Sequence, residues 1–155
     1  MADTQFNQVY PPSAFYFKVM FGGTQETTDT SFQEVSGISS EVEVESLVEG
    51  GENRFVYQLP KGIKHPNLEL KRGIASKDST LVKWCIDVME GDFVTAIETK
   101  AVRVFLMNED KKPIRGWLFD SAYPVKWEVE SFGSTKNEVA IEKIVLSYNF
   151  SKRIV

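Results

Sequence analysis

Residues 41–73 constrain the fold more strongly than any other part of the chain. Within residues 41–48, valine occupies positions 42, 44 and 48, and glutamate occupies positions 41, 43 and 45. A period of two is typical of a β-strand with one buried face. The pair Gly50-Gly51 can supply the positive φ of a tight reversal, and apolar residues resume the alternation beyond it. The sequence therefore predicts a long β-hairpin over residues 41–59, which ends at Pro60 before a third, shorter strand.

The alternation gives this hairpin two different faces. We expect Val42 and Val44 to face the protein's own core, so that the glutamates face the opposite side. The hairpin carries no group that an enzyme would need, but its long edges expose backbone groups that a monomer must hide. Pairing of these edges with other subunits is the use that the pattern favours.

Length and composition are those of a single domain. The chain has 155 residues, of which 42% are hydrophobic and 11 are phenylalanine, a composition that favours a sheet with a sizeable core. Its net charge of -4 disfavours nonspecific binding to nucleic acid or to an anionic membrane. No apolar run is long enough for a transmembrane helix, and the N-terminus lacks the pattern of a signal peptide. The single cysteine suits a reducing compartment, so we expect synthesis in the cytoplasm.

The rest of the chain is predicted to be mostly strands. They are expected at 15–21, 32–35, 102–107, 114–122, 123–130 and 138–153, after a polar N-terminal arm over residues 1–13. The strand 15–21 is apolar on both faces and is therefore expected to be central, and Val125, Trp127 and Val129 are expected to point inward. In the last strand the apolar positions change from odd to even numbers, which predicts a β-bulge near Glu142-Lys143.

One segment has the period of a helix. Residues 78–90 place apolar side chains at positions 81, 84, 85, 88 and 89, with Asp78 or Ser79 as a cap and Gly91 as a left-handed end. The fold class that follows is mainly β, an antiparallel barrel or sandwich with one packed α-helix and a long extended hairpin.

Side chains that could support chemistry are few. His65 lies in a loop with no identifiable nucleophile, and Cys85 lies on the apolar stripe of the helix, where a packing thiol is expected. One histidine and one cysteine provide no zinc site, and the regularly spaced glutamates are splayed along a strand. The sequence therefore predicts no catalytic residue, no cofactor and no metal site.

Several short motifs, in their order along the chain, carry a resemblance. They are Val-Ser-Gly-Ile at 35–38, Glu-Gly-Gly at 49–51, Leu-Pro-Lys-Gly at 59–62, His-Pro-Asn-Leu-Glu-Leu-Lys-Arg-Gly at 65–73, the helix with Trp84, the segments 117–119 and 123–127, and Tyr148. In this order, over nearly the whole chain, the sequence resembles the tail tube protein family of contractile phage tails and extracellular contractile injection systems. The tube proteins of type VI secretion are more distant relatives.

The resemblance implies a structural subunit and not an enzyme. In the family, six-fold rings stack into a hollow tube inside a contractile sheath, so the implied partners are other copies of the chain, the sheath protein, baseplate or hub proteins and tube terminators. The implied cargo is either effector proteins or phage DNA, and the implied location is the assembled tail or injection particle. A head-to-tail interface that closes gives a ring, and stacked rings give a filament.

Two groups of residues are candidates for assembly. Those expected to line the lumen or the seam between rings are Glu41, Glu43, Glu45, Arg54 and Gln58. Those expected at subunit interfaces are Leu47, Val48, Gly50, Gly51, Phe55, Tyr57, Lys71 and Arg72.

Two other readings of the sequence stay open at this point. A β-sandwich could bind a small ligand or a glycan by stacking on Trp117 or Trp127. A hydrolase could use an unconventional site around His65 or Asp120.

Overall fold

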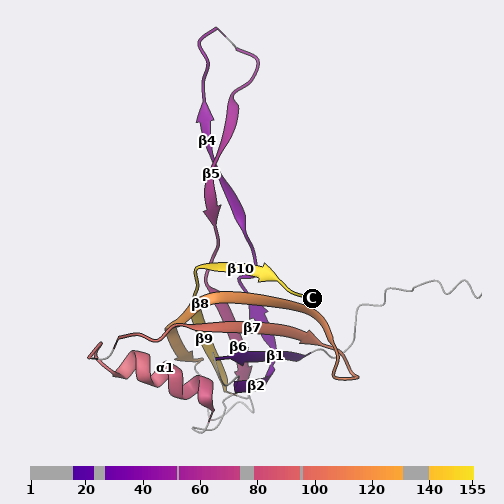
Figure 1. Ribbon diagram of the computed structural model, residues 1–155, viewed down its shortest axis with the longest axis vertical. Helices are drawn as coiled ribbons and strands as arrows, with labels where there is room; N and C mark the ends of the chain where they lie inside the picture. The colour runs from indigo at the N-terminus through magenta and orange to yellow at the C-terminus, as the bar shows by residue number, and fades with distance from the viewer. Residues whose placement is uncertain (1–15, 23–26, 52, 74–78, 95, 131–139) are drawn as a thin grey trace, which may run out of the picture.

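A computed structural model describes residues 16–22, 27–51, 53–73, 79–94, 96–130 and 140–155. The expected N-terminal arm lies outside these residues. Over the described part the chain is mainly β, with one α-helix on the body and a narrow projection formed by two strands (Figure 1). The elements are β1 (Tyr16–Phe21), β2 (Thr27–Phe32), β3 (Glu34–Ser36), β4 (Glu41–Leu47), β5 (Tyr57–Lys64), β6 (Leu68–Gly73), α1 (Thr80–Glu90), β7 (Lys100–Met107), β8 (Pro113–Val129), β9 (Ile141–Ser147) and β10 (Phe150–Arg153).

The body is an antiparallel sheet with the strand order β2-β1-β7-β8-β9-β6-β3, in which β10 pairs with β8. The strands β2 and β3 lie at opposite ends of this order but follow each other in the chain through Gln33, whose N–H donates to the Lys71 carbonyl of β6 at 2.9 Å. The sheet therefore curls, so that its two ends meet. The expected central strand is confirmed, since β1 lies between β2 and β7. The curled sheet encloses one apolar core, to which β1, β2, β6, α1, β7, β8 and β9 all contribute buried side chains.

The strand β8 is longer than the sequence predicts. The two expected strands 114–122 and 123–130 form one strand of 17 residues, with Ser121 at a positive φ of 52°. Its first half pairs with β7 and β10, and its second half pairs with β9 after a register shift between Pro124 and Lys126. Because this shift turns Pro124 into the core, Val125 points outward and is exposed. Val129 is also exposed at the strand end, so only Trp127 of the expected inward trio packs against the core.

The predicted bulge in the last strand is wrong. The strand β9 pairs with β6 without a shift, and Glu142 continues the buried face that Ile144 and Leu146 also occupy. A charged residue fills the core-facing position where the apolar pattern breaks. This position can hold a charge because Arg72, on the neighbouring β6, is also buried.

Arg72 and Glu142 form a buried ion pair at the centre of a polar network. Arg72 Nε lies 3.1 Å from Glu142 Oε2, and Arg72 Nη2 donates to Ser79 Oγ at 2.9 Å. Trp127 Nε1 donates to the other Glu142 oxygen at 2.7 Å, and the guanidinium carbon lies 4.6 Å from the centre of the Phe32 ring. The expectation that Arg72 lies at a subunit interface is therefore wrong, because the residue is 3% exposed.

The helix α1 packs on the body by its apolar stripe. Ser79 caps it by accepting a hydrogen bond from Val82 N, while the side chains of Leu81, Trp84 and Cys85 are buried. The Trp84 ring stacks on Phe21 with centroids 5.9 Å apart, and its Nε1 donates to the Glu98 carbonyl at 3.1 Å.

The far end of the helix differs from the expectation. Met89 is exposed, and Gly91 has a φ of -77°, so it is not the left-handed end that its position suggested. The left-handed residues are the next two, Asp92 and Phe93. In the middle of the helix, burial and the Glu142 carboxylate raise the pKa of the Cys85 thiol to about 12, which agrees with the expected packing role.

Removal of one partner of the buried pair should destabilise the body strongly. Arg72→Met leaves the Glu142 carboxylate buried without its cation, and we expect a loss of about 3–5 kcal/mol in the free energy of unfolding, measured by urea denaturation. The double variant Arg72→Met/Glu142→Gln removes the charge and should recover part of this loss. Lys71→Met is the control, since Lys71 makes a partly exposed ion pair with Glu130 at 3.5 Å and should cost about 1 kcal/mol or less. Equal losses for Arg72→Met and Lys71→Met would contradict the assignment.

Truncation of the stacked tryptophan should open a cavity between α1 and β1. Trp84 is 5% exposed, so Trp84→Ala should cost about 3–5 kcal/mol, measured as a lower melting temperature. Met89→Ala changes an exposed position of the same helix and serves as the control, for which we expect little change. An unchanged melting temperature for Trp84→Ala would show that the stripe is a docking surface instead of a packed one.

Candidate functional site

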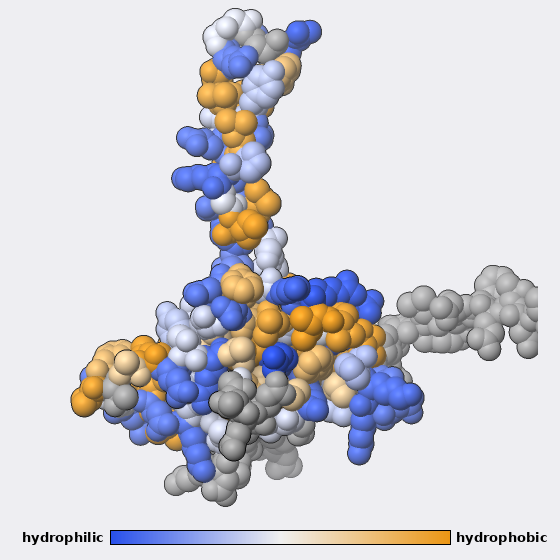
Figure 2. All heavy atoms as spheres, in the orientation of Figure 1, coloured by the Kyte–Doolittle hydropathy of each residue, from blue (hydrophilic) through white to orange (hydrophobic). Residues whose placement is uncertain are grey.

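The hairpin formed by β4 and β5 is the most exposed part of the described structure. Every residue of both strands is exposed, and the hairpin extends away from the body with apolar and charged side chains along it (Figure 2). Val42 and Val44 are each 54% exposed, so the expectation that they face the protein's own core is wrong. The reason is geometric, because no other described element of the same chain covers either face of the hairpin.

The hairpin is also longer than predicted. The sequence suggested that the hairpin ends at Pro60. The strand β5 instead continues through Pro60 to Lys64. Pro60 lies opposite Val44, next to a register shift between Glu43 and Val44 that leaves Lys61 as an extra residue in β5. A proline is tolerated in a strand at such a bulge, since the ladder there has no regular hydrogen bond for it to break.

The cross-strand register assigns side chains to two faces, because directly opposite residues of an antiparallel pair share a face. The valine face carries Val42 opposite Ile63, Val44 opposite Pro60 and Ser46 opposite Gln58. The glutamate face carries Glu41 opposite Lys64, Glu43 opposite Gly62, Glu45 opposite Leu59 and Leu47 opposite Tyr57. Apolar side chains therefore occupy the valine face near the body and the glutamate face near the tip.

The expected acidic surface is only partly present. Glu41, Glu43 and Glu45 do share one face, but Lys64 Nζ lies 3.9 Å from the carboxylates of both Glu41 and Glu43. Gln58 belongs to the opposite face, where its Nε2 donates to Ser46 Oγ at 3.1 Å. All these groups are well exposed, so the ion pairs contribute little to stability and remain available to a partner.

The tip of the hairpin carries most of the residues expected at subunit interfaces. Val48 is 72% exposed, and Phe55 and Tyr57 contact each other edge to face with ring centroids 5.0 Å apart. Arg54 lies exposed in the same loop. Of the two glycines at the reversal, Gly51 takes a positive φ of 98° and Gly50 does not.

The foot of the hairpin is fixed to the body. The strands β3 and β6, which lead into and out of it, pair with each other, and Ser36 Oγ donates to the Glu69 carboxylate at 3.2 Å. Gly37 has a φ of 86°, and a Cβ there would lie 2.0 Å from the Asn67 carbonyl oxygen, so only glycine fits. His65 stacks on Tyr148 with centroids 3.9 Å apart. These contacts fix the direction in which the hairpin leaves the body.

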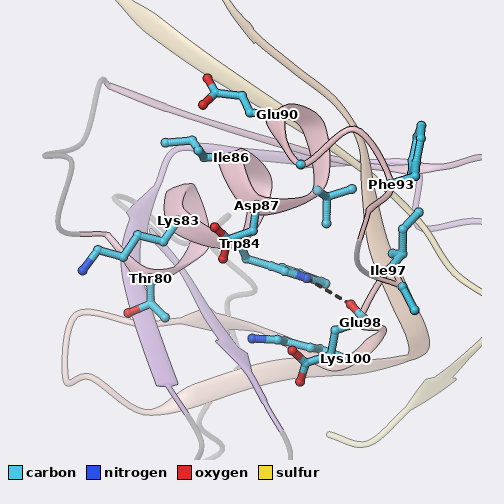
Figure 3. Close-up of a pocket in the computed structure, with 13 residues that line it drawn as sticks. Thr80, Lys83, Trp84, Ile86, Asp87, Glu90, Phe93, Ile97, Glu98 and Lys100 are labelled. Atoms are coloured by element: carbon cyan, nitrogen blue, oxygen red, sulfur yellow. Dashed lines mark hydrogen bonds between the residues drawn. The ribbon is translucent and has the colours of Figure 1, made fainter.

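A groove of about 750 Å³ lies between α1 and the segment that follows it (Figure 3). The Trp84 ring and its hydrogen bond to the Glu98 carbonyl form one wall, and Phe93 and Ile97 line the other side. Lys100 Nζ lies 5.4 Å from the Trp84 ring. The described residues that line the groove combine apolar side chains with charged ones, and none of the hydrogen bonds described among them joins a nucleophile to a base.

The other two readings of the sequence find no support in the geometry. Trp117 and Trp127 are partly buried and pack against the core. Both ring nitrogens of His65 lie near backbone carbonyl oxygens, those of Pro66 and Asn149, and Asp120 contacts the Ser121 hydroxyl instead of the histidine. Among the described residues no group of three or more His, Cys, Asp or Glu is arranged to hold a metal ion, and none of their helices is long and apolar enough to cross a membrane.

Comparison with known proteins decides the family. Residues 13–152 match the family model described as "T4-like virus tail tube protein gp19". The chain belongs to this tail tube protein family. The resemblance on which the sequence analysis relied is confirmed, and the protein is a tube subunit of the contractile-tail type. The comparison with curated proteins gives no match.

Solved structures share the fold of this tail tube protein. A chain in the cryo-EM structure of the anti-feeding prophage baseplate, six-fold symmetrised, is 27% identical with a TM-score of 0.79, and the match covers 94% of this chain and 96% of that one. A chain of an extracellular contractile injection system, the PVC sheath-tube complex in the extended state, is 21% identical with a TM-score of 0.76, covering 99% and 98%. Hcp1 from Flavobacterium johnsoniae is 16% identical with a TM-score of 0.56, covering 89% and 94%.

The two glycines of the reversal should respond differently to substitution. Gly51→Val forces a β-branched residue to a φ of 98° and should disorder the tip, which we expect to appear as faster amide exchange of residues 47–57. Gly50→Val changes a position without a positive φ and without any atom within 4 Å of an added Cβ, and it is the matched control. The opposite order of effects would contradict the turn geometry.

Proposed function

We propose that this tail tube protein forms six-membered rings that stack into a hollow tube, and that the β4-β5 hairpin is the main element of this assembly. The observation that carries the proposal is the exposure of every residue of both strands. A two-stranded hairpin is at best marginally stable in water, and exposed apolar side chains in both its halves add to the cost. A hairpin of this kind gains its stability when neighbouring subunits cover it.

The partners are proposed from the structures that share the fold. Those structures include a sheath-tube complex, a six-fold baseplate and a tube terminator. We propose the corresponding sheath, baseplate or hub, and terminator proteins as partners of this chain, with effector proteins or phage DNA as the cargo of the lumen. The proposed role is structural and not catalytic, and the proposed location is the assembled particle.

Self-assembly tests the proposal directly. Size-exclusion chromatography and sedimentation over a wide concentration range should show ring-sized species, and negative-stain microscopy should show rings and tubes. A strictly monomeric protein at all concentrations, with no tubes even in the presence of sheath and baseplate proteins, would refute the proposed assembly.

The glutamates of β4 can be assigned to the lumen or to the seam between rings by charge reversal. If Glu41, Glu43 and Glu45 line the lumen, the triple change to lysine should leave tubes intact but make them retain anionic cargo, because the wall has become positive. If these residues lie at the seam, rings should form but stacking should fail, because the introduced lysines would face cations of the next ring. Tube length by microscopy and retention of a labelled acidic protein distinguish the two. Glu90→Lys on the exposed end of α1 is a control, and normal tubes with unaltered cargo behaviour would exclude both assignments.

A further inference from the structure

The groove between α1 and the segment that follows it presents apolar side chains to solvent, and we propose that the N-terminal arm of a second copy of the chain occupies it. The arm, residues 1–13, precedes β1 in the sequence. Its run Tyr10-Pro11-Pro12 makes the contact by packing on the aromatic and aliphatic side chains of the groove. This inference rests on the proposed ring, because it needs a neighbouring copy beside each body, but it does not involve the hairpin.

The groove keeps apolar side chains in water at the far end of α1. Phe93 lines it and is 75% exposed, and Ile97 on the same side is 37% exposed. Figure 2 shows hydrophobic surface at this end of the body. The Trp84 ring belongs to the other wall, so a segment that enters the groove lies between an indole and a phenyl ring. Exposed apolar side chains around a concave site are typical of a surface that binds another protein segment.

The backbone holds Phe93 in this exposed position against its own preference. Asp92 and Phe93 take positive φ values of 48° and 56°, which are unfavourable for residues other than glycine and most of all for a bulky one. Within the described chain the Phe93 ring gains little burial in return. Backbone strain of this kind is concentrated at sites of binding and function. A partner that covers the ring explains why the conformation is kept.

The sequence of the arm suits such a groove. Its only charged side chain is Asp3, and it contains the run Val9-Tyr10-Pro11-Pro12. Proline fixes its own φ and holds the residue before it extended, so the run loses little conformational entropy when it is bound. Extended proline-containing segments are recognised by grooves lined with aromatic side chains, which Trp84 and Phe93 provide here.

The arm and the groove belong to opposite ends of the same strand. The chain enters the body at Tyr16, which pairs with Met107 at the end of β7. The groove meets β7 at Lys100, its first residue, and α1 lies at that end of the strand (Figure 1). Because a strand rises about 3.3 Å per residue, the two points are about 23 Å apart.

This separation selects a second copy as the source of the arm. From Pro11 to Tyr16 the chain spans at most about 18 Å even when it is fully extended. The arm of the same chain would also have to reverse its direction before it ran back along β7, and the reversal shortens its reach. A head-to-tail ring brings two different sides of adjacent bodies together, so the side of one copy that carries Tyr16 faces the α1 side of the next.

Substitutions on both sides test the contact. Phe93→Ser should raise the concentration at which rings form by about tenfold, measured by sedimentation, and Tyr10→Ser should do the same, because each removes one aromatic anchor. The double variant should be no worse than either single one, since all three lose the same contact. Circular dichroism should be unchanged, since the Phe93 ring is exposed.

The residue next to Phe93 provides the matched control. Val94 is 88% exposed but lies outside the described lining of the groove, so Val94→Ser should leave ring formation unchanged. An equal effect of Val94→Ser and Phe93→Ser would overturn the proposal. Additive effects of Tyr10→Ser and Phe93→Ser would also overturn it, because they would show that the two side chains have different partners.

Disulfide crosslinking identifies the chain that supplies the arm. Chains with Tyr10→Cys and chains with Ile97→Cys are mixed in equal amounts, assembled and then oxidised, and we expect a two-chain product. The native Cys85 does not compete, because it is buried with its pKa raised to about 12. A mixture of Tyr10→Cys with Lys126→Cys, at an exposed position on the distant half of β8, is the control and should give no product.

Both cysteines on one chain distinguish the possible occupants. Tyr10→Cys/Ile97→Cys should give a ladder of linked chains on a denaturing gel. A crosslink within single chains and no ladder would show that each groove holds the arm of its own chain, and rings without any crosslink would show that the groove has another occupant. Either result overturns the proposal while the proposed ring stands. Failure of the unaltered protein to form rings would refute the proposed function itself, and this inference with it.

Discussion

The ion pair between Arg72 and Glu142 joins most of the elements that make up the body. Arg72 comes from β6 and Glu142 from β9, and through them the Trp127 indole of β8, the Ser79 cap of α1 and the Phe32 ring of β2 are fixed in one network. A buried charge pair adds little to the free energy of unfolding compared with apolar residues of the same shape. Removal of only one of its partners, however, is strongly destabilising. The effect of the pair is therefore to favour one arrangement, since a shifted register of β6 on β9 would separate the two charges and leave at least one of them buried without a partner.

That fixed register has consequences for the hairpin. The strand β6 is the continuation of β5, and its partner β3 leads into β4, so the ladder between β3 and β6 sets the angle at which the hairpin leaves the body. Gly37 and the stacking of His65 on Tyr148 hold the same junction from either side. The body thus fixes the direction of the hairpin, which has no core of its own. In a tube, a fixed angle at the foot would place the tips of all subunits at equal positions, which is what regular stacking requires.

The division into a self-sufficient body and an uncovered hairpin also explains the distribution of apolar residues. The body buries phenylalanine, leucine and valine from both ends of the chain in one cluster. The hairpin keeps valine, leucine, isoleucine and tyrosine in water at exposures that a monomer has no reason to maintain. The free energy that these side chains do not contribute to folding is available to association. In the proposed tube, association by hairpins would spread that contribution over many equal contacts along the filament.

The sequence alone determined the family, the helix and most of the strands, but not the full length of β8 or of the hairpin. Period-two alternation specified strands at β4 and β7, the apolar positions of residues 15–21 specified β1, the stripe at Trp84 specified α1, and the order of short motifs specified a tail tube protein. These features depend on residues close together in the chain, where local geometry decides the outcome. The sequence did not determine what each face touches. Glu142 looked like a break in a strand, Arg72 looked like a surface cation, and Val42 looked like a core residue. Each assignment depends on a distant part of the chain. Glu142 is buried because Arg72 lies beside it on the next strand, and Val42 is exposed because no layer of this chain reaches the hairpin, so only the tertiary structure could decide them.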